Sequence, residues 1–402
     1  MTDAFIYDAV RTPRGLGRPN GALHTLSPLD LSVAVLGALQ ARTGFDKMQV
    51  DDVVFGVGDA VDDQGANLAR SAVLETGLSE TIAGATVSRF CASGLDAATI
   101  CAAKVMAGQA DLVIAGGVEM MSLVPIGGTG GPFGSDAKFN TTANLTPLGI
   151  AADLIATLDG HTREQADAVA VESQSRAARA WDEGRFARSV VPVKDFNGVT
   201  LLERDEHPRP GTTLEALGKL KPAFAEFAAK SGFGEVVKAR YPEVDSLTHI
   251  HTGGNSSGVV DGAAGLVIGS ALVAERLALT PRAKVVSFAT VGCDPCLALT
   301  APGEAARRAL ARAGLGFEDM DLIECNEAFA SVVLRFLSET GVPADKVNVN
   351  GGAIAMGHPI GATGLILMGT LLDELERVGK RRGLVTMCVG VGMGAAAIIE
   401  RV

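Results

Sequence analysis

The same succession of helix and strand signals occurs twice in this chain, once near each end. The first copy comprises a helical pattern, a strand, a second helix and a second strand, over 28–41, 52–56, 68–77 and 85–88. The second copy repeats that order over 302–313, 321–325, a helix that ends near 340, and 346–350. The second helix of each copy closes on Glu-Thr-Gly, and a glycine directly after a helix is a C-cap signal. The repetition predicts two related halves.

A glycine-containing turn, a helix and an apolar strand follow each copy. The helices are expected over 95–107 and 363–378, and the strands over 111–115 and 383–387. A first strand over 4–10 opens the chain. Short apolar runs that alternate with helices indicate βαβ units with mostly parallel, buried strands. The chain is therefore expected to be an α/β protein built from two duplicated halves.

The region 120–250 breaks this pattern and is expected to be an insertion in the first half. It contains a glycine-rich segment, most of the polar loops and two helical stretches, over 163–183 and 213–230. An insertion over a shared scaffold is a natural place for substrate specificity. The predicted domains are a first half over 1–119 and 251–272, an inserted loop domain over 120–250, and a second half over 273–402.

The bulk properties narrow the classes of function and of compartment. With 402 residues and 47% hydrophobic residues, the chain can bury a large core. A net charge of −11 gives no basic surface for nucleic acid. No targeting segment is expected before the first strand, and no run approaches the ~20 apolar residues that cross a bilayer. Six irregularly spaced cysteines do not form a disulfide framework, so a reducing compartment, the cytoplasm, is expected.

Cys91 is the first candidate for chemistry. It follows a strand and opens a helix, where unpaired N–H groups and the helix dipole favour a thiolate. The alternative is a small buried residue at a strand–helix junction, which is the commoner place for a lone cysteine.

His358 and Cys388 could complete a reactive set. His358 stands between Gly357 and Pro359 in a turn without helix or strand periodicity, which favours a general base over a hydrogen-bonded loop histidine. Cys388 ends an apolar strand and enters Gly390-x-Gly392-x-Gly394, whose backbone N–H groups could form an oxyanion hole. A nucleophilic thiol, a histidine that activates it and a second thiol that moves protons are what thioester exchange at carbon requires.

Other candidates carry less chemistry. Cys293 and Cys296 form a single Cys-x-x-Cys without the further ligands of a metal site, so we interpret them as structural. Cys101 and Cys325 fall on apolar faces and are expected in the core. Asn326 follows a strand, where it either caps a helix or aims a dipole into a crevice at the sheet edge.

Together these motifs resemble the thiolase superfamily along the whole chain. The matching segments, in order, are Arg11-Thr12-Pro13, the turn at Cys91, Ala115-Gly116-Gly117-Val118-Glu119-Met120-Met121-Ser122, Asn255-x-Ser257-Gly258, Asn326-Glu327-Ala328-Phe329, 350–364 and Cys388-x-Gly390. The segment His251-Thr252-Gly253-Gly254 and the long insertion before it are most similar to 3-ketoacyl-CoA thiolase β subunits of bacterial fatty-acid-oxidation trifunctional enzymes.

The resemblance implies a five-layer α-β-α-β-α fold and a function. It implies that Cys91 attacks a 3-ketoacyl-CoA, that His358 takes its proton, and that Cys388 protonates the departing acetyl-CoA enolate. It implies oxyanion holes from Asn326 with His358 and from the N–H groups of Cys91 and Gly390.

The resemblance also implies how the substrates bind and how the chain assembles. Ser257 with Gly258 would contact the pantetheine of CoA, and Lys221 would reach a CoA phosphate. Coenzyme A is then a co-substrate, and no permanently bound cofactor or metal is expected. A homodimer or homotetramer is expected, with a hydratase/dehydrogenase α subunit as a possible partner.

Two positions depart from the pattern of the family. Val391 stands where a third glycine is usual, and a β-branched residue resists a positive φ. Leu148, in Pro147-Leu148-Gly149, stands where acetoacetyl-CoA-specific members often carry His-Met-Gly.

Three other functions are compatible with parts of this pattern. An acetoacetyl-CoA-specific acetyl-CoA acetyltransferase is the first alternative, and a non-catalytic scaffold is a second. A decarboxylating ketoacyl synthase is disfavoured, because those enzymes lack the second catalytic cysteine that Cys388 supplies here.

Overall fold

The helices begin and end where the sequence supplies capping residues. In the computed structural model, which describes residues 2–46 and 48–402, helix α1 (Pro28–Thr43) starts after Ser27. Ser27 and Asp30 form a capping box, and the helix ends at Gly44 with a φ of 65°. Helix α13 (Ala330–Thr340) likewise ends at Gly341 with a φ of 69°. The predicted helix signals therefore set the local boundaries.

The first half forms a five-stranded sheet in the order β4-β3-β5-β8-β1. Its strands are β1 (Phe5–Arg11), β3 (Asp52–Gly56), β4 (Ala83–Val87), β5 (Leu112–Met120) and β8 (Val260–Gly269), and the short β2 (Gly15–Leu16) pairs with β8. Strands β3, β4 and β5 run parallel, whereas β8 is antiparallel to both of its neighbours. Strands β5 and β8 are buried along their whole length, as apolar runs between helix layers should be.

The second half repeats this arrangement in the order β10-β11-β12-β9. Its strands are β9 (Ala283–Gly292), β10 (Leu322–Cys325), β11 (Arg382–Val389) and β12 (Met393–Arg401). Again the pair β10–β11 is parallel, and β12 is antiparallel to both of its neighbours. The two sheets meet where the first residues of β1 and β9 pair, at Phe5–Lys284 and Ile6–Ala283.

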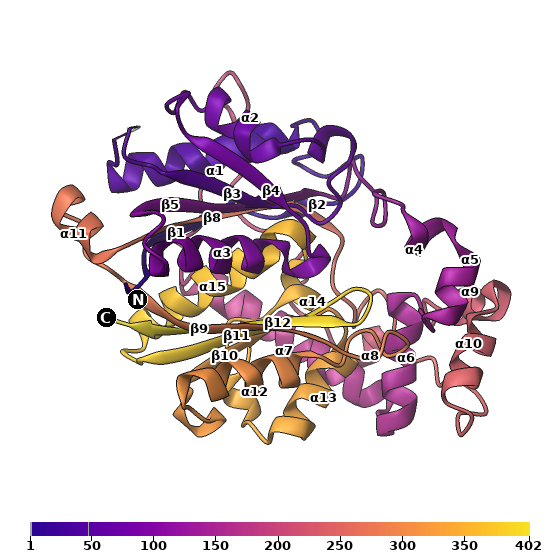
Figure 1. Ribbon diagram of the computed structural model, residues 1–402. Coiled ribbons are helices and arrows are strands. Elements are labelled where there is room, and N and C mark those ends of the chain that lie inside the picture. The colour runs from indigo at the N-terminus through magenta and orange to yellow at the C-terminus, as the bar shows by residue number, and fades with distance from the viewer. Residues whose placement is uncertain (1, 47) are drawn as a thin grey trace.

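The layers confirm the expected five-layer fold. Figure 1 shows α1 and α2 (Leu68–Glu75) outside the first sheet, and α12 (Pro302–Ala313) and α13 outside the second. Helices α3 (Ser93–Met106) and α15 (Ile360–Arg377) lie between the sheets, where α3, α15 and both sheets share one hydrophobic core. The central layer therefore contains one helix from each half.

Two sequence expectations about secondary structure are wrong. The strand expected over 346–350 is reduced to a single parallel bridge between Val347 and Ile323, preceded by the 3-10 turn η4 (Ala344–Lys346). The helix expected over 213–230 is broken into α8 (Leu214–Gly218) and α9 (Ala225–Ser231). Pro222 lies in the break, and its missing N–H and fixed φ do not allow a continuous helix.

The inserted region comprises α4 (Pro132–Ser135), α5 (Ala137–Thr142), α6 (Leu148–Asp159), α7 (Arg163–Asp182), β6 (Val193–Lys194), β7 (Thr200–Leu202), α8, α9 and α10 (Phe233–Arg240). Figure 1 shows α4, α5, α9 and α10 together at one end of the layers. Val193 of β6 instead packs in the core of the first half. Helices α6 and α7 pack on α13 of the second half, through clusters that include Ile155 with Val332 and Ala166 with Ala330. The insertion thus contacts the half to which it does not belong in sequence. Short α11 (Ala271–Leu277) links β8 to β9.

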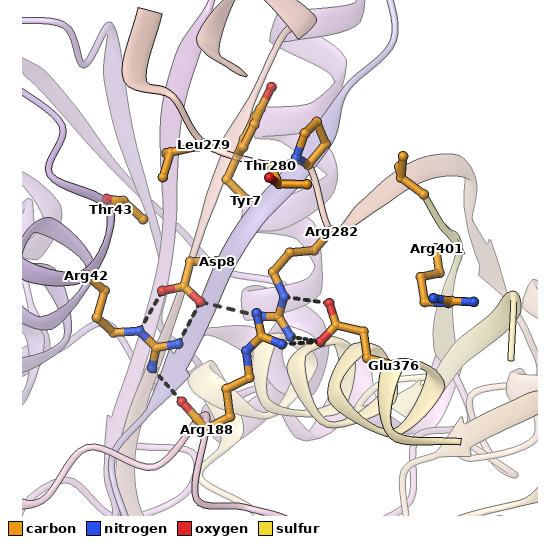
Figure 2. A pocket seen from close by; sticks show the side chains of 12 residues that line it. Tyr7, Asp8, Arg42, Thr43, Arg188, Leu279, Thr280, Arg282, Glu376 and Arg401 are labelled. Atoms are coloured by element: carbon orange, nitrogen blue, oxygen red, sulfur yellow. Dashed lines mark hydrogen bonds and ion pairs between the residues drawn. The ribbon is translucent and has the colours of Figure 1, made fainter. Parts of the chain in front are cut away.

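A buried arginine ties the two halves together at the other end of the sheets. Figure 2 shows Arg282, at the start of β9, between Asp8 of β1 and Glu376 of α15. Its side chain is 5% exposed and also bonds Asp373, while Arg42 of α1 pairs with the other side of Asp8. These ion pairs line a surface cleft of about 520 Å³. Each of the carboxylates of Asp8, Asp373 and Glu376 has an arginine partner. These ion pairs therefore hold the two halves together at the cleft.

The central helices approach so closely that only glycine fits between them. A Cβ on Gly94 of α3 would lie 2.6 Å from the carbonyl oxygen of Gly361 in α15. A Cβ on Gly364, one turn further along, would lie 2.3 Å from the backbone nitrogen of Leu95. Since the opposing atoms are backbone, they cannot rotate away. The N-terminal turns of α3 and α15 are therefore locked side by side.

We predict that Gly94→Ala lowers the stability of the protein by about 1–3 kcal/mol, because the new methyl group overlaps the α15 backbone. Thermal and urea unfolding followed by circular dichroism measure the change. Gly37→Ala in α1 is the matched control, because its Cβ would meet no atom within 4 Å. That variant should gain about 0.5–1 kcal/mol from helix propensity alone. Equal unfolding midpoints for Gly94→Ala and wild type would contradict the close-packing argument.

Candidate active site

Cys91 and His358 occupy equivalent positions in the two halves. Cys91 lies in the turn η2 (Phe90–Ala92) before α3, and His358 lies in the turn before α15. The residue before each is left-handed, Phe90 with a φ of 44° and Gly357 with a φ of 92°. A bulky residue such as Phe90 adopts this conformation only when its surroundings impose it. The duplication has therefore placed a thiol and an imidazole at matching ends of neighbouring helices.

The Cys91 thiol is buried and points at backbone N–H groups. It is 6% exposed. Burial raises its pKa to about 11, although hydrogen bonds from the N–H groups of Gly390 and of Cys91 itself act to lower it. The expectation that the helix N-terminus favours a thiolate is therefore wrong for the resting protein, because loss of solvation outweighs the dipole. The contact with Gly390 does bring the loop after β11 to the nucleophile, as the sequence predicted.

Cys388 lies at the end of β11 beside Cys91. It has no exposed surface. Burial, followed by the proximity of Cys91, raises the pKa of its thiol well above the usual value. Both sulfurs are therefore protonated thiols at neutral pH, and all six cysteines are free. A protonated Cys388 can give a proton before it takes one.

The tautomer of His358 follows from its hydrogen bonds. Its Nδ1 lies 2.6 Å from Oγ1 of Thr363, and that hydroxyl donates its own hydrogen to the carbonyl of Pro359 at 2.9 Å. The hydroxyl must therefore accept from Nδ1–H, which leaves the lone pair on Nε2. Burial and, second, the charge of Arg14 lower the pKa of His358 to about 3, so the ring is neutral. A neutral imidazole with a free Nε2 has the form of a general base.

Asn326 faces the basic nitrogen of His358. Its Nδ2 lies 3.4 Å from His358 Nε2, and its Oδ1 has no hydrogen-bond partner among the described residues. The backbone N–H of Asn326 donates to the carbonyl of Thr386 in β11, at the edge where β10 ends. Of the two interpretations of Asn326, the structure thus supports a side chain aimed into the site, because α13 begins only at Ala330.

The loop of Ser257 and Gly258 supports both His358 and Asn326. The carbonyl of Gly258 accepts from the N–H of His358 at 2.9 Å. The N–H of Ser257 donates to the carbonyl of Ala328, in the segment that carries Asn326. These bonds join the loop before β8 of the first half to the second half and place it at the rim of the site.

The glycine loop after Cys388 contains a strained residue. Val391 has a φ of 68°, the left-handed conformation that its β-branched side chain disfavours. The departure noted in the sequence is therefore accommodated by strain, and the loop keeps the turn that a glycine would make. Gly392 follows with a φ of 77°, and its carbonyl accepts from the N–H of Cys293.

Leu148 and Lys221 are placed differently by the inserted region. Leu148, the first residue of α6, packs with Phe224 and Leu297 against an apolar cluster that contains Cys388. Lys221 is exposed at the surface. It lies two residues before Ala223, whose N–H donates to the carbonyl of His251. The structure thus brings Leu148 to the site and leaves Lys221 on its outer side.

Two groups at the site were missed by the sequence reasoning. Thr363 fixes the tautomer of His358. It lies five residues further along the chain, in the first turn of the following helix, and this short spacing could have indicated the contact. Arg14 is 4% exposed, and its Nη1 donates to the carbonyl of Gly357 at 3.1 Å. No local signal distinguished Arg14 from a surface arginine. Within residues 2–46 and 48–402, no cluster of histidine, cysteine and carboxylate side chains is placed to hold a metal ion.

Comparisons with known proteins agree with this geometry. The family model described as "Thiolase, N-terminal domain" matches residues 4–231, and "Thiolase, C-terminal domain" matches residues 279–401. The chain is 42% identical to a β-ketoadipyl-CoA thiolase of Pseudomonas aeruginosa, over 100% of this chain and 99% of that protein. It is 39% identical to a 3-ketoacyl-CoA thiolase of Marinobacter nauticus, over 100% and 98%. The crystal structure of an acetyl-CoA acetyltransferase of Bacillus anthracis superposes with a TM-score of 0.85 at 33% identity, over 100% and 99%.

We predict that Thr363→Val releases the His358 tautomer, because the hydroxyl that accepts from Nδ1–H is lost. Histidine-labelled protein gives the proportions of the two tautomers from its ¹⁵N shifts, with His358→Gln assigning the signal among the six histidines. The Nδ1–H form should dominate in wild type and in Thr363→Ser, and both tautomers should appear in Thr363→Val. A single unchanged Nδ1–H tautomer in Thr363→Val would contradict the assignment.

Proposed function

The chain belongs to the thiolase family and is an acyltransferase, and from this premise we propose the reaction, the role of each residue and the class of acyl chain. The reaction is the CoA-dependent cleavage of a 3-ketoacyl-CoA into acetyl-CoA and a shortened acyl-CoA, reversible as a Claisen condensation. One observation carries the proposal: Cys91 and Cys388 come from different halves and lie beside each other, and His358 lies in the turn before α15, the buried helix that packs on η2 and α3.

The first half-reaction transfers the acyl group to Cys91. Nε2 of His358 takes the proton of the Cys91 thiol, and the sulfur adds to the 3-keto carbon. The bond between C2 and C3 breaks, its electron pair forms the enolate of acetyl-CoA, and the Cys388 thiol donates a proton to C2. The pKa of Cys388, raised by burial, suits a group that must stay protonated until a strong carbon base appears.

The second half-reaction restores both thiols. The thiol of CoA gives its proton to the Cys388 thiolate, and its sulfur attacks the acyl group on Cys91. The Cys91 sulfur then leaves and regains its proton from the imidazolium of His358. All protons return to their starting positions, so neither half-reaction needs a further acid or base.

Two groups of donors are placed for the negative charge that forms on oxygen. The N–H groups of Cys91 and Gly390 both point at the Cys91 sulfur, where the acyl carbonyl would lie once attached. Asn326 forms the second group together with His358, whose Nε2 can donate once it has taken the proton of Cys91, and the unpartnered Oδ1 of Asn326 can fix a water there. Preorganised donors of this kind stabilise a tetrahedral intermediate without reorganising.

The surroundings of Cys388 favour an apolar acyl chain. The cluster about Cys388 comprises aliphatic and aromatic residues, with Leu148, Leu297 and Phe224 at its partly exposed edge. Each methylene buried there contributes about 0.8 kcal/mol, whereas an unpaired carboxylate would be costly. This supports a fatty-acid-oxidation substrate over the dicarboxylic substrate named for the relative from Pseudomonas aeruginosa. An acetoacetyl-CoA-specific enzyme is the second candidate, favoured by the likeness to an acetyl-CoA acetyltransferase structure.

Coenzyme A is proposed as co-substrate at the rim formed by Ser257 and Gly258. Those residues lie between His358 and the surface, so a pantetheine arm passing them would end at Cys91. Lys221 is exposed on the inserted segment next to this loop and is available for a phosphate of CoA. Lys221→Ala should raise the KM for CoA without changing kcat, and an unchanged KM would remove Lys221 from the binding site.

We also propose a homodimer or homotetramer in the cytoplasm, with a hydratase/dehydrogenase α subunit as a possible partner. The six free cysteines support a reducing compartment. Among the described residues, the longest apolar helices fall short of what is needed to cross a membrane. A monomer in sedimentation velocity at micromolar concentration would contradict the assembly.

The two cysteines should fail at different steps. Cys91→Ser should abolish the acyl-enzyme, because its hydroxyl is a far weaker nucleophile under the same base. Cys388→Ala should still accept an acyl group from acyl-CoA but should lose carbon–carbon cleavage by at least ~10³-fold. Intact-protein mass spectrometry and a CoA-release assay separate the steps, with Cys101→Ala as a buried-cysteine control. Wild-type rates in either variant would overturn its assigned role, and an inactive wild type would favour a non-catalytic scaffold.

A matched pair of substrates tests the acyl-chain class. We expect thiolysis of 3-oxohexanoyl-CoA to exceed that of 3-oxoadipyl-CoA, which has the same length but ends in a carboxylate. Along acetoacetyl-, 3-oxohexanoyl- and 3-oxodecanoyl-CoA, kcat/KM should rise by up to about fourfold per methylene while the chain fits the apolar cluster. Preference for 3-oxoadipyl-CoA would overturn the apolar assignment, and cleavage of acetoacetyl-CoA alone would support the acetyltransferase.

A further inference from the structure

Arg14 is a buried charge that the proposed reaction does not use. It follows β1, its side chain reaches the turn before α15, and Nη1 donates to the carbonyl of Gly357. Its Nε has no partner among the described residues. Burial lowers the pKa of Arg14 to about 10, so the group remains charged at neutral pH. A buried cation is expensive, which raises the question of what it does there.

One carboxylate serves two arginines at this place. Asp205 makes a bidentate pair with Arg11 at 2.7 and 2.9 Å and also accepts from the backbone N–H of Arg14 at 2.8 Å. Burial opposes the charge on Asp205, but the two guanidinium groups outweigh it and hold the pKa of that carboxyl below its usual range. Glu324 and Glu327 also attract Arg14, yet burial raises the pKa of each and so favours its neutral form. The positive charge of Arg14 beside Gly357 and His358 is therefore only partly matched by carboxylates.

The other ionisable groups around the His358 turn do not replace this charge. The elements packed around this turn carry seven further ionisable groups. They are Cys91 on η2, Cys388 on β11, Glu119 on β5, Glu324 on β10, Glu327 after β10, and Asp205 and His207 after β7. His207 is neutral as well, because burial lowers its pKa and its Nδ1 is bonded to the carbonyl of Ala355. Besides burial, Arg14 is the group that lowers the pKa of His358.

We propose that Arg14 is a positioning residue of the active site: it fixes the Gly357–His358 turn, and its charge beside that turn adds to the effect of burial in disfavouring a proton on the imidazole of the resting enzyme. In the one-proton exchange between Cys91 and His358, the thiol–imidazole pair is then preferred over the thiolate–imidazolium pair. Proton transfer from Cys91 to His358 then becomes favourable only together with addition of the sulfur to the keto carbon, because the negative charge that moves to the substrate oxygen offsets Arg14. The resting nucleophile is thereby protected from adventitious electrophiles. This inference rests on the proposed role of His358 as the base for Cys91.

The test is alkylation of Cys91 by iodoacetamide without substrate, followed for each cysteine by peptide mass spectrometry at pH 7. Removing the charge in Arg14→Met favours the imidazolium, so the thiolate–imidazolium pair becomes more populated. Alkylation of Cys91 should rise about tenfold, the equivalent of one pKa unit. Arg14→Lys keeps a cation beside Asp205 and should stay near the wild-type rate. His358→Gln, added to Arg14→Met, should abolish the gain.

Two further readouts separate this role from a structural one. A loosened fold would raise the alkylation of Cys293 and Cys388 together with that of Cys91, and that result would overturn the proposal. The acid limb of kcat/KM for thiolysis should move to higher pH in Arg14→Met, because a more basic imidazole is lost as a base at higher pH. An unchanged Cys91 rate in a folded Arg14→Met protein would also overturn it. Since alkylation needs no substrate, an inactive wild type would count against the proposed function and leave the Arg14 measurement interpretable.

Discussion

The architecture depends on the close approach of two helices that contain glycine where they touch. Gly94 and Gly364 let the first turns of α3 and α15 approach each other's backbone to a distance that no side chain permits. Each helix is preceded by a tight turn with one left-handed residue, and those turns hold Cys91 and His358. Everything else at the site is positioned relative to this contact. A loss of registration between the helices would separate the thiol from its base even if both sheets stayed intact.

Burial has opposite effects on the groups that this contact brings together. It raises the pKa of both thiols and lowers that of the imidazole, so the resting site is a set of neutral groups. Without substrate, the two thiols and the imidazole are uncharged, which avoids the free-energy cost of burying unpaired ions. The charged side chains of Arg14 and Asp205 lie behind these groups, where Arg14 contacts the residue before His358. Chemistry then depends on proton transfers that substrate binding makes favourable.

The two halves have diverged at the same topological points. Strand β4 closes one edge of the first sheet, whereas the corresponding segment of the second half keeps one bridge at Val347. The insertion leaves the first half, packs on α13 of the second and returns through the Ser257–Gly258 loop to β8. It therefore supplies the apolar wall near Leu148 from outside the duplicated scaffold. In the proposed reaction, the halves provide the reacting groups, and the insertion provides the surface that the acyl chain meets.

The sequence by itself determined most of the local elements and supplied the candidate reactive residues. Capping signals such as Ser27 with Asp30, the duplicated pattern of helices and strands, and the glycine-flanked Cys91, His358 and Cys388 could all be read along the chain. What depended on solvation or on long-range contact could not be read there. Only the tertiary structure decided that Cys91 is a thiol at rest, since the helix dipole is local and the loss of solvent is not. Only it decided that Thr363 holds the His358 tautomer, that 346–350 is left with one bridge, and that Arg14 shares Asp205 with Arg11. The protonation of Cys91, the lost strand and the sharing of Asp205 depend on atoms distant in sequence, and pairing between distant residues leaves no periodic signal in a single chain. Thr363 is only five residues from His358, but the hydrogen bond between them is visible only in three dimensions.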